Sequence, residues 1–158
     1  MSNILITGVG SYLPKKVIPN NELPVNLNTN DEWIKKRTGI RQRHLVTEGE
    51  LTSTMAIAAA KKALQNANID SRDIDLIIVA TTTPDQTFPA TAVKVQSELN
   101  IGICPAFDIQ AVCAGFIYAL NVGSSLLKTS NFSKALVIGS ESFSKILDWT
   151  DRSTSVLF

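Results

Sequence analysis

The stretch "AFDIQAVCAGFIYALNVGSSLLK", Ala106 to Lys128, joins an apolar strand signal, a cysteine and an apolar helical pattern. It predicts a strand over 106–110, a short turn that holds Cys113, and a helix over 114–128. Main-chain N–H groups at the start of that helix would favour the thiolate form of the sulfur. The small neighbouring residues would let a substrate carbonyl approach and would let main-chain N–H groups stabilise an oxyanion. Cys113 is therefore a candidate nucleophile, and the alternative is a buried packing cysteine.

The same strand and helix signals recur on both sides of this stretch. Besides 106–110, strands are expected over 3–9, 75–82, 134–141 and 154–158, and helices from 31 and over 52–68 and 90–99. The run Ile77 to Ala80 lacks polar alternation, which is typical of a strand covered on both faces. The alternating order predicts an α/β fold: a mostly parallel five-stranded sheet with helices on both faces.

Two of the expected helical stretches carry few charges on any face. These are Met55 to Ala60 and Ala114 to Leu127, and a surface helix would normally show a polar side. Both are expected in an inner layer, and one sheet within 158 residues is not enough to cover them. The final "TSVLF" resembles a strand that stops at Phe158, which suggests a fragment, a split gene or a truncated reading frame.

Composition and charge exclude several functional classes. The chain has 158 residues, 44% hydrophobic and 18% charged, which suits one globular domain. A formal net charge of +1 gives no reason to expect nucleic acid or an anionic membrane as partner. The uncharged run from Ile109 to Leu127 is interrupted by polar residues and glycines, so a helix buried in protein is expected rather than a membrane span.

Cysteine and histidine usage argues against a metal site. Cys104 and Cys113 lack metal-ligand spacing, and His44 is the only histidine. No disulfide framework or signal peptide is expected, which favours a reducing cytoplasm. His44 is the obvious candidate base, but it lies in the cationic stretch "RQRHLV", where a structural or solvated role is the commoner one. Cys104 is expected to be a packing residue.

Two pairs of acidic residues are further candidates for a catalytic base, but the sequence does not favour them. Asp31 with Glu32 opens an expected helix, and Asp73 with Asp75 precedes an expected strand. Neither pair lies beside a pocket signal. We interpret them as helix-cap and surface charges.

Three segments together resemble the β-ketoacyl-acyl carrier protein synthase III family. They are "NDEWIKKRTGIRQRH", "TTTPDQTFPATA" and "DIQAVCAGF", and the resemblance extends along the whole chain. The cysteine segment alone is also similar to thiolases, chalcone-type synthases and hydroxymethylglutaryl-CoA synthases, whereas the other two point to the synthase III branch. The resemblance implies a thiolase-like fold, of which residues 1–158 would be the N-terminal half-domain.

The resemblance also implies an activity and a set of site residues. Members transfer an acyl group, usually acetyl, from coenzyme A to a cysteine, and malonyl-acyl carrier protein then decarboxylates and attacks that thioester. Acyl-coenzyme A and acyl carrier protein are thus the implied partners, with no cofactor and no metal, and members form homodimers. Cys113 matches the nucleophile, and the adenine end of coenzyme A is implied to contact Trp33, Arg37, Arg152 and, with less support, Thr29. Phe88 matches a residue that reaches across a dimer interface to border the partner subunit's acyl pocket, and Leu157 matches an acyl-pocket wall.

The chain departs from the family in length. Members are about twice as long, and their catalytic His and Asn come from the second half; His44 does not match that His. The expectation is an N-terminal half that is inactive or incomplete alone and that needs a second polypeptide. The alternatives are a non-catalytic remnant and a related condensing enzyme with a different starter acyl group.

Overall fold

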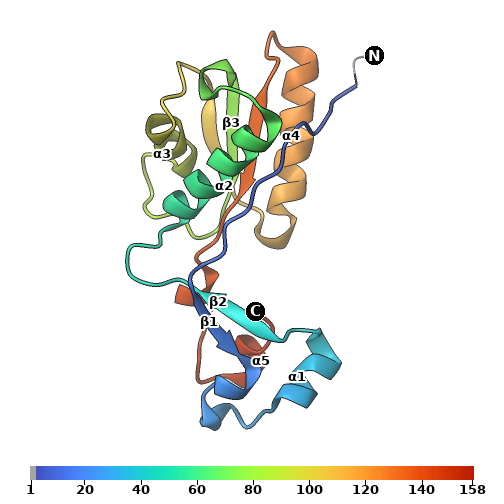
Figure 1. Cartoon of the computed structure of the whole chain (residues 1–158), viewed down its shortest axis with the longest axis vertical. Helices are drawn as coiled ribbons and strands as arrows, with labels where there is room; N and C mark the ends of the chain where they lie inside the picture. The colour runs from blue at the N-terminus through green and yellow to red at the C-terminus, as the bar shows by residue number, and fades with distance from the viewer. Residues whose placement is uncertain (1–2) are drawn as a thin grey trace. The chain divides into compact units, whose positions relative to one another are not determined.

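The computed structural model describes residues 3–158, which pack into two compact units. We call the first the sheet unit: the residues up to Tyr12 together with Leu51–Glu141. The second is the hairpin unit: Leu13–Glu50 together with Ser142–Phe158. Figure 1 follows the chain through both of them.

The sheet unit is built on three parallel strands. Their order is β4 (Ala106–Ile109), β3 (Leu76–Ala80), β5 (Ala135–Gly139). Ile77 lies opposite Ala106 on one side and Leu136 on the other. All five residues of β3 are buried, as the unbroken apolar run in the sequence predicts.

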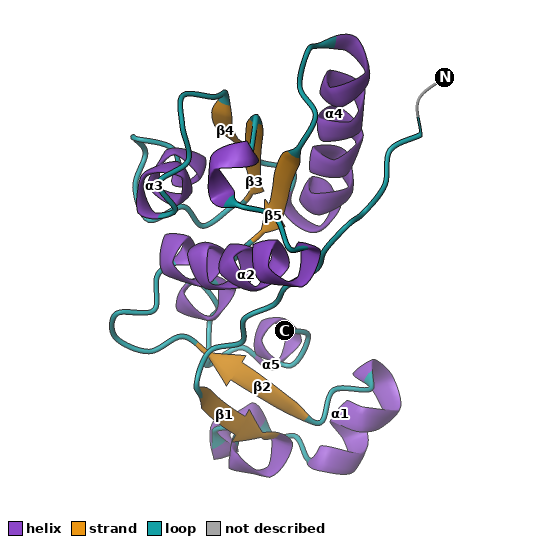
Figure 2. Ribbon diagram, turned by 45° about the horizontal axis from the view of Figure 1, so that its top comes forward, coloured by secondary structure: helices purple, strands orange, loops and turns teal. Residues whose placement is uncertain are grey.

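Helices cover both faces of this sheet. The helices are α2 (Thr52–Ala67), α3 (Thr91–Glu98) and α4 (Gly115–Thr129). Ile77 and Val79 of β3 pack in one hydrophobic cluster with α2 and α3, whereas Leu76 and Ile78 pack in another with Ala119 of α4. Alternate residues of one strand therefore serve both faces, and Figure 2 shows the helices around the strands. The expected α/β class is confirmed, but this sheet has three strands rather than five.

The expectation of a strand at the N-terminus is wrong. Residues 3–9 form no strand, and Figure 2 draws them as a loop. Their apolar side chains are largely exposed, with Leu5 at 77% and Ile6 at 75%. A strand needs a neighbour to complete its hydrogen-bond ladder, and among residues 3–158 none pairs with this segment.

This N-terminal segment instead packs against α2 through two glycines. A Cβ atom on Gly8 would lie 2.5 Å from the carbonyl oxygen of Ala63, and one on Gly10 would collide with the carbonyl oxygen of Ala59. The main-chain N–H of Val9 also donates to the Asn66 side chain at 3.0 Å. The N-terminal segment, α3 and the sheet thus cover much of α2. This apolar helix is therefore largely covered within the sheet unit.

Helix α4 keeps several apolar side chains exposed. Phe116, Ile117, Tyr118 and Val122 are 44%, 64%, 55% and 37% exposed, whereas Ala119 is fully buried against the sheet. The expectation that the sheet alone would not cover this helix is therefore confirmed.

The hairpin unit contains a second, antiparallel sheet. Strand β1 (Lys16–Pro19) pairs with β2 (Gln42–Leu45), with Val17 opposite His44. Helix α1 (Asp31–Thr38) lies between them in sequence, and its core residue Ile34 packs with Leu27 and Val156. This hairpin was not expected, because "RQRHL" is too polar to carry a strand signal.

The last residues are helical rather than extended, contrary to the expected strand over 154–158. Helix α5 (Arg152–Ser155) begins after Asp151, whose side chain accepts hydrogen bonds from the main-chain N–H of Ser153 and from the hydroxyls of Ser153 and Thr154. Such an N-terminal cap stabilises the first turn of a helix over an extended strand. Short 3₁₀ turns complete the fold: Asn20–Glu22, Val25–Leu27, Ser71–Asp73, Val112–Ala114 and Phe143–Lys145.

Candidate functional site

Cys113 lies on a strained turn at the carboxyl end of the parallel sheet. It is the middle residue of the 3₁₀ turn Val112–Ala114, which connects β4 to α4, and it is exposed. Val112 has φ +46°, a left-handed conformation that is costly for a β-branched residue. Strain of about 1–3 kcal/mol is kept mainly where function requires it. The expected strand, turn and helix around the cysteine are confirmed, and its sulfur is open to reactants.

Two carboxylates hold the neighbouring loops at this edge of the sheet. Glu141, after β5, accepts hydrogen bonds from the main-chain N–H groups of Thr82 (2.7 Å) and Thr83 (3.1 Å) after β3. Asp108 of β4 accepts from the N–H groups of Thr91 (2.7 Å) and Ala92 (2.8 Å), which begin α3. An anion at a helix start is favourable because those N–H groups have no partner inside the helix.

Sequence reasoning missed both of these carboxylates. The available signal was an acidic residue inside or just after an apolar strand, where a charge is costly unless main-chain donors satisfy it. Asp108 and Glu141 each meet that description in the printed sequence.

Cys104 has the opposite environment. It is half-buried in the cluster between the sheet, α2 and α3. Burial raises the pKa of its thiol, the Asp75 carboxylate adds to this, and a contact with Gln96 partly offsets it. Cys104 is thus a packing residue, as expected.

Trp33, Arg37 and Arg152 meet in the hairpin unit. The guanidinium carbon of Arg37, one turn further along α1, lies 4.2 Å from the Trp33 ring centre. That of Arg152, from α5, lies 5.1 Å from the same ring centre. Both distances suit a cation–π contact. The structure therefore brings Arg152 to Trp33 and Arg37, from which the sequence separates it by more than a hundred positions, and we call the three residues the tryptophan–arginine cluster.

Thr29 and Asn28 precede α1 and adjoin this cluster. The Arg152 side chain donates to the carbonyl oxygen of Asn28 at 3.0 Å. The hydroxyl oxygen of Thr29 is buried and has no hydrogen-bond partner among the described residues. A buried hydroxyl without a partner costs stability. Asn30 begins the helix by accepting from the Trp33 main-chain N–H at 2.8 Å, which fixes the start of α1.

The other three sequence candidates are distributed over both units. Phe88, in the sheet unit, is 82% exposed, and Leu157, in the hairpin unit, is 57% exposed. A ring nitrogen of His44 lies 2.7 Å from the carbonyl oxygen of Pro14, a structural contact within the hairpin unit.

The acidic pairs also make structural contacts. Asp31 bonds to Lys35 and Asn20, and the Lys35 hydrogen bond is the main reason that its pKa is lowered. Asp75 accepts from Ser133, and Asp73 lies 3.6 Å from the Lys134 ammonium. These contacts match the reading as cap and surface charges.

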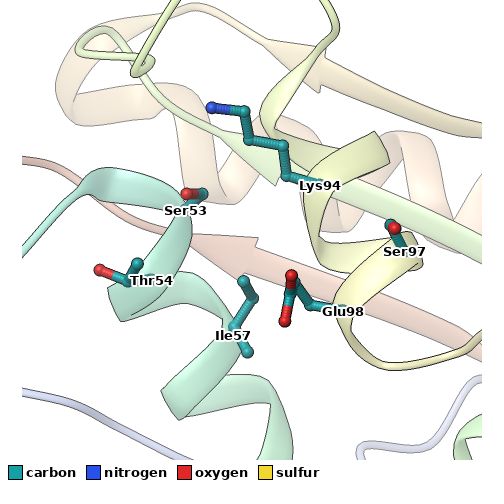
Figure 3. A pocket seen from close by; sticks show the side chains of 6 residues that line it. All are labelled: Ser53, Thr54, Ile57, Lys94, Ser97 and Glu98. Atoms are coloured by element: carbon teal, nitrogen blue, oxygen red, sulfur yellow. The ribbon is translucent and has the colours of Figure 1, made fainter.

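A shallow hollow between α2 and α3 involves none of the predicted site residues. Figure 3 shows Glu98 of α3 beside Ile57 of α2, whereas Lys94 extends toward the side of Ser53. Lys94 is paired with Asp85 at 3.1 Å. Among residues 3–158, no helix is long and apolar enough to cross a membrane, and no cluster of side chains is suited to hold a metal ion.

Comparison with known proteins gives a consistent result. Residues 107–158 match the family described as 3-oxoacyl-[acyl-carrier-protein] synthase III. The β-ketoacyl-[acyl-carrier-protein] synthase III of Ehrlichia canis is 59% identical over the whole chain, which covers 50% of that protein. The chain spans about half the length of the curated relatives that it matches.

Solved structures agree with the sequence relatives. The crystal structure of 3-oxoacyl-[acyl-carrier-protein] synthase III from Aquifex aeolicus superposes with a TM-score of 0.92 at 49% identity, covering 97% of this chain and 49% of that one. Xanthomonas campestris OleA, solved with bound lauric acid and lauroyl-CoA, has a TM-score of 0.74 at 25% identity and covers 82% of this chain and 41% of its own.

Proposed function

The chain belongs to the β-ketoacyl-[acyl-carrier-protein] synthase III family and corresponds to about half of a member, and from this premise we propose that it supplies the acyl-accepting cysteine of such an enzyme. The observation that carries the proposal is the exposed Cys113 on its strained turn directly before α4. A packing cysteine would need neither the exposure nor the strain.

The chemistry is a two-step condensation. The Cys113 thiolate attacks the thioester carbonyl of acyl-coenzyme A, the carbon–sulfur bond to coenzyme A breaks, and coenzyme A leaves as a thiol after taking up a proton. Malonyl-acyl carrier protein then loses carbon dioxide, and the resulting carbanion attacks the acyl-cysteine and expels the thiolate. The product is a β-ketoacyl-acyl carrier protein, which begins fatty acid synthesis. The starter is acetyl or another short acyl group.

The tryptophan–arginine cluster is proposed to hold the adenine end of coenzyme A. An indole face stacks on a purine, and guanidinium groups pair with phosphate oxygens. Arg37 and Arg152 are exposed and lie against Trp33, so a planar ligand would find both types of contact in one place. Thr29, which follows the Asn28 that Arg152 contacts, is proposed to line the same site. The lauroyl-CoA bound to OleA supports this ligand class.

The exposed Phe88 and Leu157 suit roles at a subunit interface and in an acyl pocket, as members of the family use them. We propose acyl carrier protein and a homodimeric assembly as the corresponding partners. Both cysteines are free thiols, which fits a cytoplasmic protein.

Acyl transfer from acetyl-coenzyme A tests the proposal directly. After incubation of the purified chain with acetyl-coenzyme A, mass spectrometry of its peptides should find the acetyl group on Cys113 and not on Cys104. Cys113→Ala should abolish this label, whereas Cys104→Ala should retain it. A folded chain that takes up no acetyl group from saturating acetyl-coenzyme A would contradict the proposal and favour a non-catalytic remnant.

We further propose that full condensation requires a second polypeptide with the other half of the family's sequence. A positioned acid–base group is worth about 10² to 10⁴ in rate, and a lost oxyanion donor costs about 10² to 10³. The family takes its His and Asn from its second half, so this chain alone should condense negligibly while still becoming acylated. The exposed apolar side chains of α4 support a missing partner. Formation of acetoacetyl-acyl carrier protein at ordinary enzyme rates by the isolated chain would refute this requirement.

A further inference from the structure

We infer that Arg43 is a positioning residue, which holds the segment carrying Arg152 so that this side chain meets the Trp33 ring. The inference rests on the proposed function, since the pair that Arg43 positions is the one proposed to hold coenzyme A. All the residues concerned belong to the hairpin unit.

Arg43 is a buried guanidinium at the centre of the unit. It lies in β2 and is only 5% exposed. One terminal nitrogen donates to the carbonyl oxygen of Val156 at 2.8 Å, and Nε donates to the main-chain oxygen of Phe158. The other terminal nitrogen donates to the side-chain oxygen of Asn20 at 2.7 Å. Arg43 thus binds the residues just after α5, the helix that Arg152 begins.

Asn20 continues this connection to the other helix of the cluster. It is 3% exposed, and its amide donates to the Asp31 carboxylate at 2.9 Å and to the carbonyl oxygen of Ile40 at 2.7 Å. Asp31 is the first residue of α1, and Ile40 lies just beyond the helix end. Asn20 therefore holds α1, which carries Trp33, and Arg43 connects Asn20 to the segment after α5.

Arg152 has few contacts that could fix its position without this support. It is exposed, and its polar contact in the described structure is one hydrogen bond to the Asn28 carbonyl, at 3.0 Å. The main chain that follows Arg152 must therefore be held in place by other residues. A planar guanidinium suits this task because its donors point in fixed directions to several oxygens at once, which a lysine ammonium does not reproduce. Among residues 3–158, Arg43 pairs with no Asp or Glu side chain, and it donates to main-chain oxygens and to the amide oxygen of Asn20.

The first experiment reads the Trp33 environment without a ligand. Trp149→Phe leaves Trp33 as the only tryptophan. In that background Arg43→Met should change the Trp33 fluorescence spectrum as Arg152→Ala does, and the double variant should show no further change. Arg41→Met is the matched control, because it removes an exposed charge next to β2, and it should leave the spectrum unchanged. A folded Arg43→Met protein with unaltered Trp33 emission would overturn the inference.

The second experiment is a double-mutant cycle on coenzyme A affinity, measured by titration calorimetry. Arg152→Ala and Arg43→Met should each weaken binding by about tenfold, and the double variant should bind no more weakly than Arg152→Ala alone. Arg43→Met combined with Arg37→Ala should instead be additive. Additive losses for Arg43 and Arg152 would show that Arg43 acts elsewhere, which refutes the inference.

Two further outcomes separate the inference from the proposed function. If Arg152→Ala leaves coenzyme A affinity unchanged, the proposed binding site is wrong, while the Trp33 spectrum still tests Arg43. If Arg43→Met does not fold, as circular dichroism would show, Arg43→Lys takes its place. It keeps the charge but carries its donors on one nitrogen, and it should give a smaller spectral change in the same direction; no change in a folded Arg43→Lys protein counts against the inference.

Discussion

At the scale of single residues, Cys113 and its neighbour Val112 belong together. The left-handed backbone at Val112 turns the chain between β4 and α4, and the thiol that follows is exposed. The sequence predicted that the cysteine lies in a turn between a strand and a helix, since a strand signal, small residues and a helical pattern surround it. It did not predict the strain, because valine normally avoids this conformation.

The two thiols should differ in reactivity. Near neutral pH, Cys113 should react with iodoacetamide at least about tenfold faster than Cys104, because the thiolate is the reacting form and burial raises the pKa of Cys104. Peptide mass spectrometry over a time course measures both rates in one sample. Equal rates in the folded protein would argue against Cys113 as the nucleophile, and equal rates in urea serve as the control.

Val112→Gly should not destabilise the protein. Glycine adopts positive φ without a steric cost, which relieves about 1–3 kcal/mol of strain, while its greater freedom in the unfolded chain costs about 0.5–1 kcal/mol. The free energy of unfolding from urea titration should therefore rise slightly or stay the same. Val122→Gly, in the middle of α4, is the control and should lower it by about 1 kcal/mol. Similar losses for both variants would mean that Val112 is not strained.

At the scale of elements, the buried strands and the longer helices were the predictable part. Strand β3 is apolar throughout, and α2, α3 and α4 begin and end within one residue of the predicted ranges. Two apolar stretches were wrongly predicted to be strands. Residues 3–9 have no pairing partner in the described chain, and residues 154–158 follow Asp151, which caps a helix. The β1–β2 hairpin was not predicted because β2 is polar, β1 has only four residues, and the two strands are far apart in sequence. The main-chain partners of Arg43, Asp108 and Glu141 could not be predicted, because no residue pattern displays them, although an acidic residue inside or just after an apolar strand was a signal for the two carboxylates.

The connection between Asp75 and the start of β5 should depend on pH. The Asp75 carboxylate accepts from the N–H and hydroxyl of Ser133 and the N–H of Lys134, and the Ser133 N–H bond is the largest cause of its lowered pKa. Since the pKa in the folded state lies below that in the unfolded state, the stabilisation is complete above the unfolded pKa, about 4. It disappears as the pH falls through the folded pKa.

Asp75→Asn should therefore lower the free energy of unfolding by about 1 kcal/mol at pH 7, and its difference from the original protein should shrink below about pH 4. Urea titrations across this pH range measure the difference. Asp73→Asn is the control: its exposed ion pair with Lys134 should contribute less than about 0.5 kcal/mol. If the difference in the free energy of unfolding between Asp75→Asn and the original protein stayed constant from pH 7 to below pH 4, the ionised Asp75 carboxylate would not be the source of this stabilisation.

At the scale of the whole molecule, the chain has about half the length of its relatives, and several apolar side chains of α4 are exposed. The sequence predicted that this helix would be incompletely covered, because the stretch from Ala114 to Leu127 carries no charge. The sequence could not show how the two compact units are divided, since each combines segments from distant parts of the chain.

Ile117→Glu should improve solubility with little effect on stability. Ile117 is 64% exposed on α4, so the substitution should reduce the binding of the dye ANS and any self-association, and change the free energy of unfolding by less than about 1 kcal/mol. Dye fluorescence and analytical ultracentrifugation measure the two effects. Ala119→Glu, on the buried face of the same helix, should cost several kcal/mol. A loss of stability as large for Ile117→Glu would mean that this face is already covered.

The contact of Gly8 and Gly10 with α2 has a consequence for how this protein can diverge. Neither position has room for even a methyl group, because main-chain carbonyl oxygens of the helix occupy that space. In a saturation mutagenesis library selected for folded protein, both codons should remain glycine, while the exposed Leu5 and Ile6 nearby should accept polar residues. Two backbone contacts, rather than the apolar side chains around them, would then set the local limit on evolutionary drift.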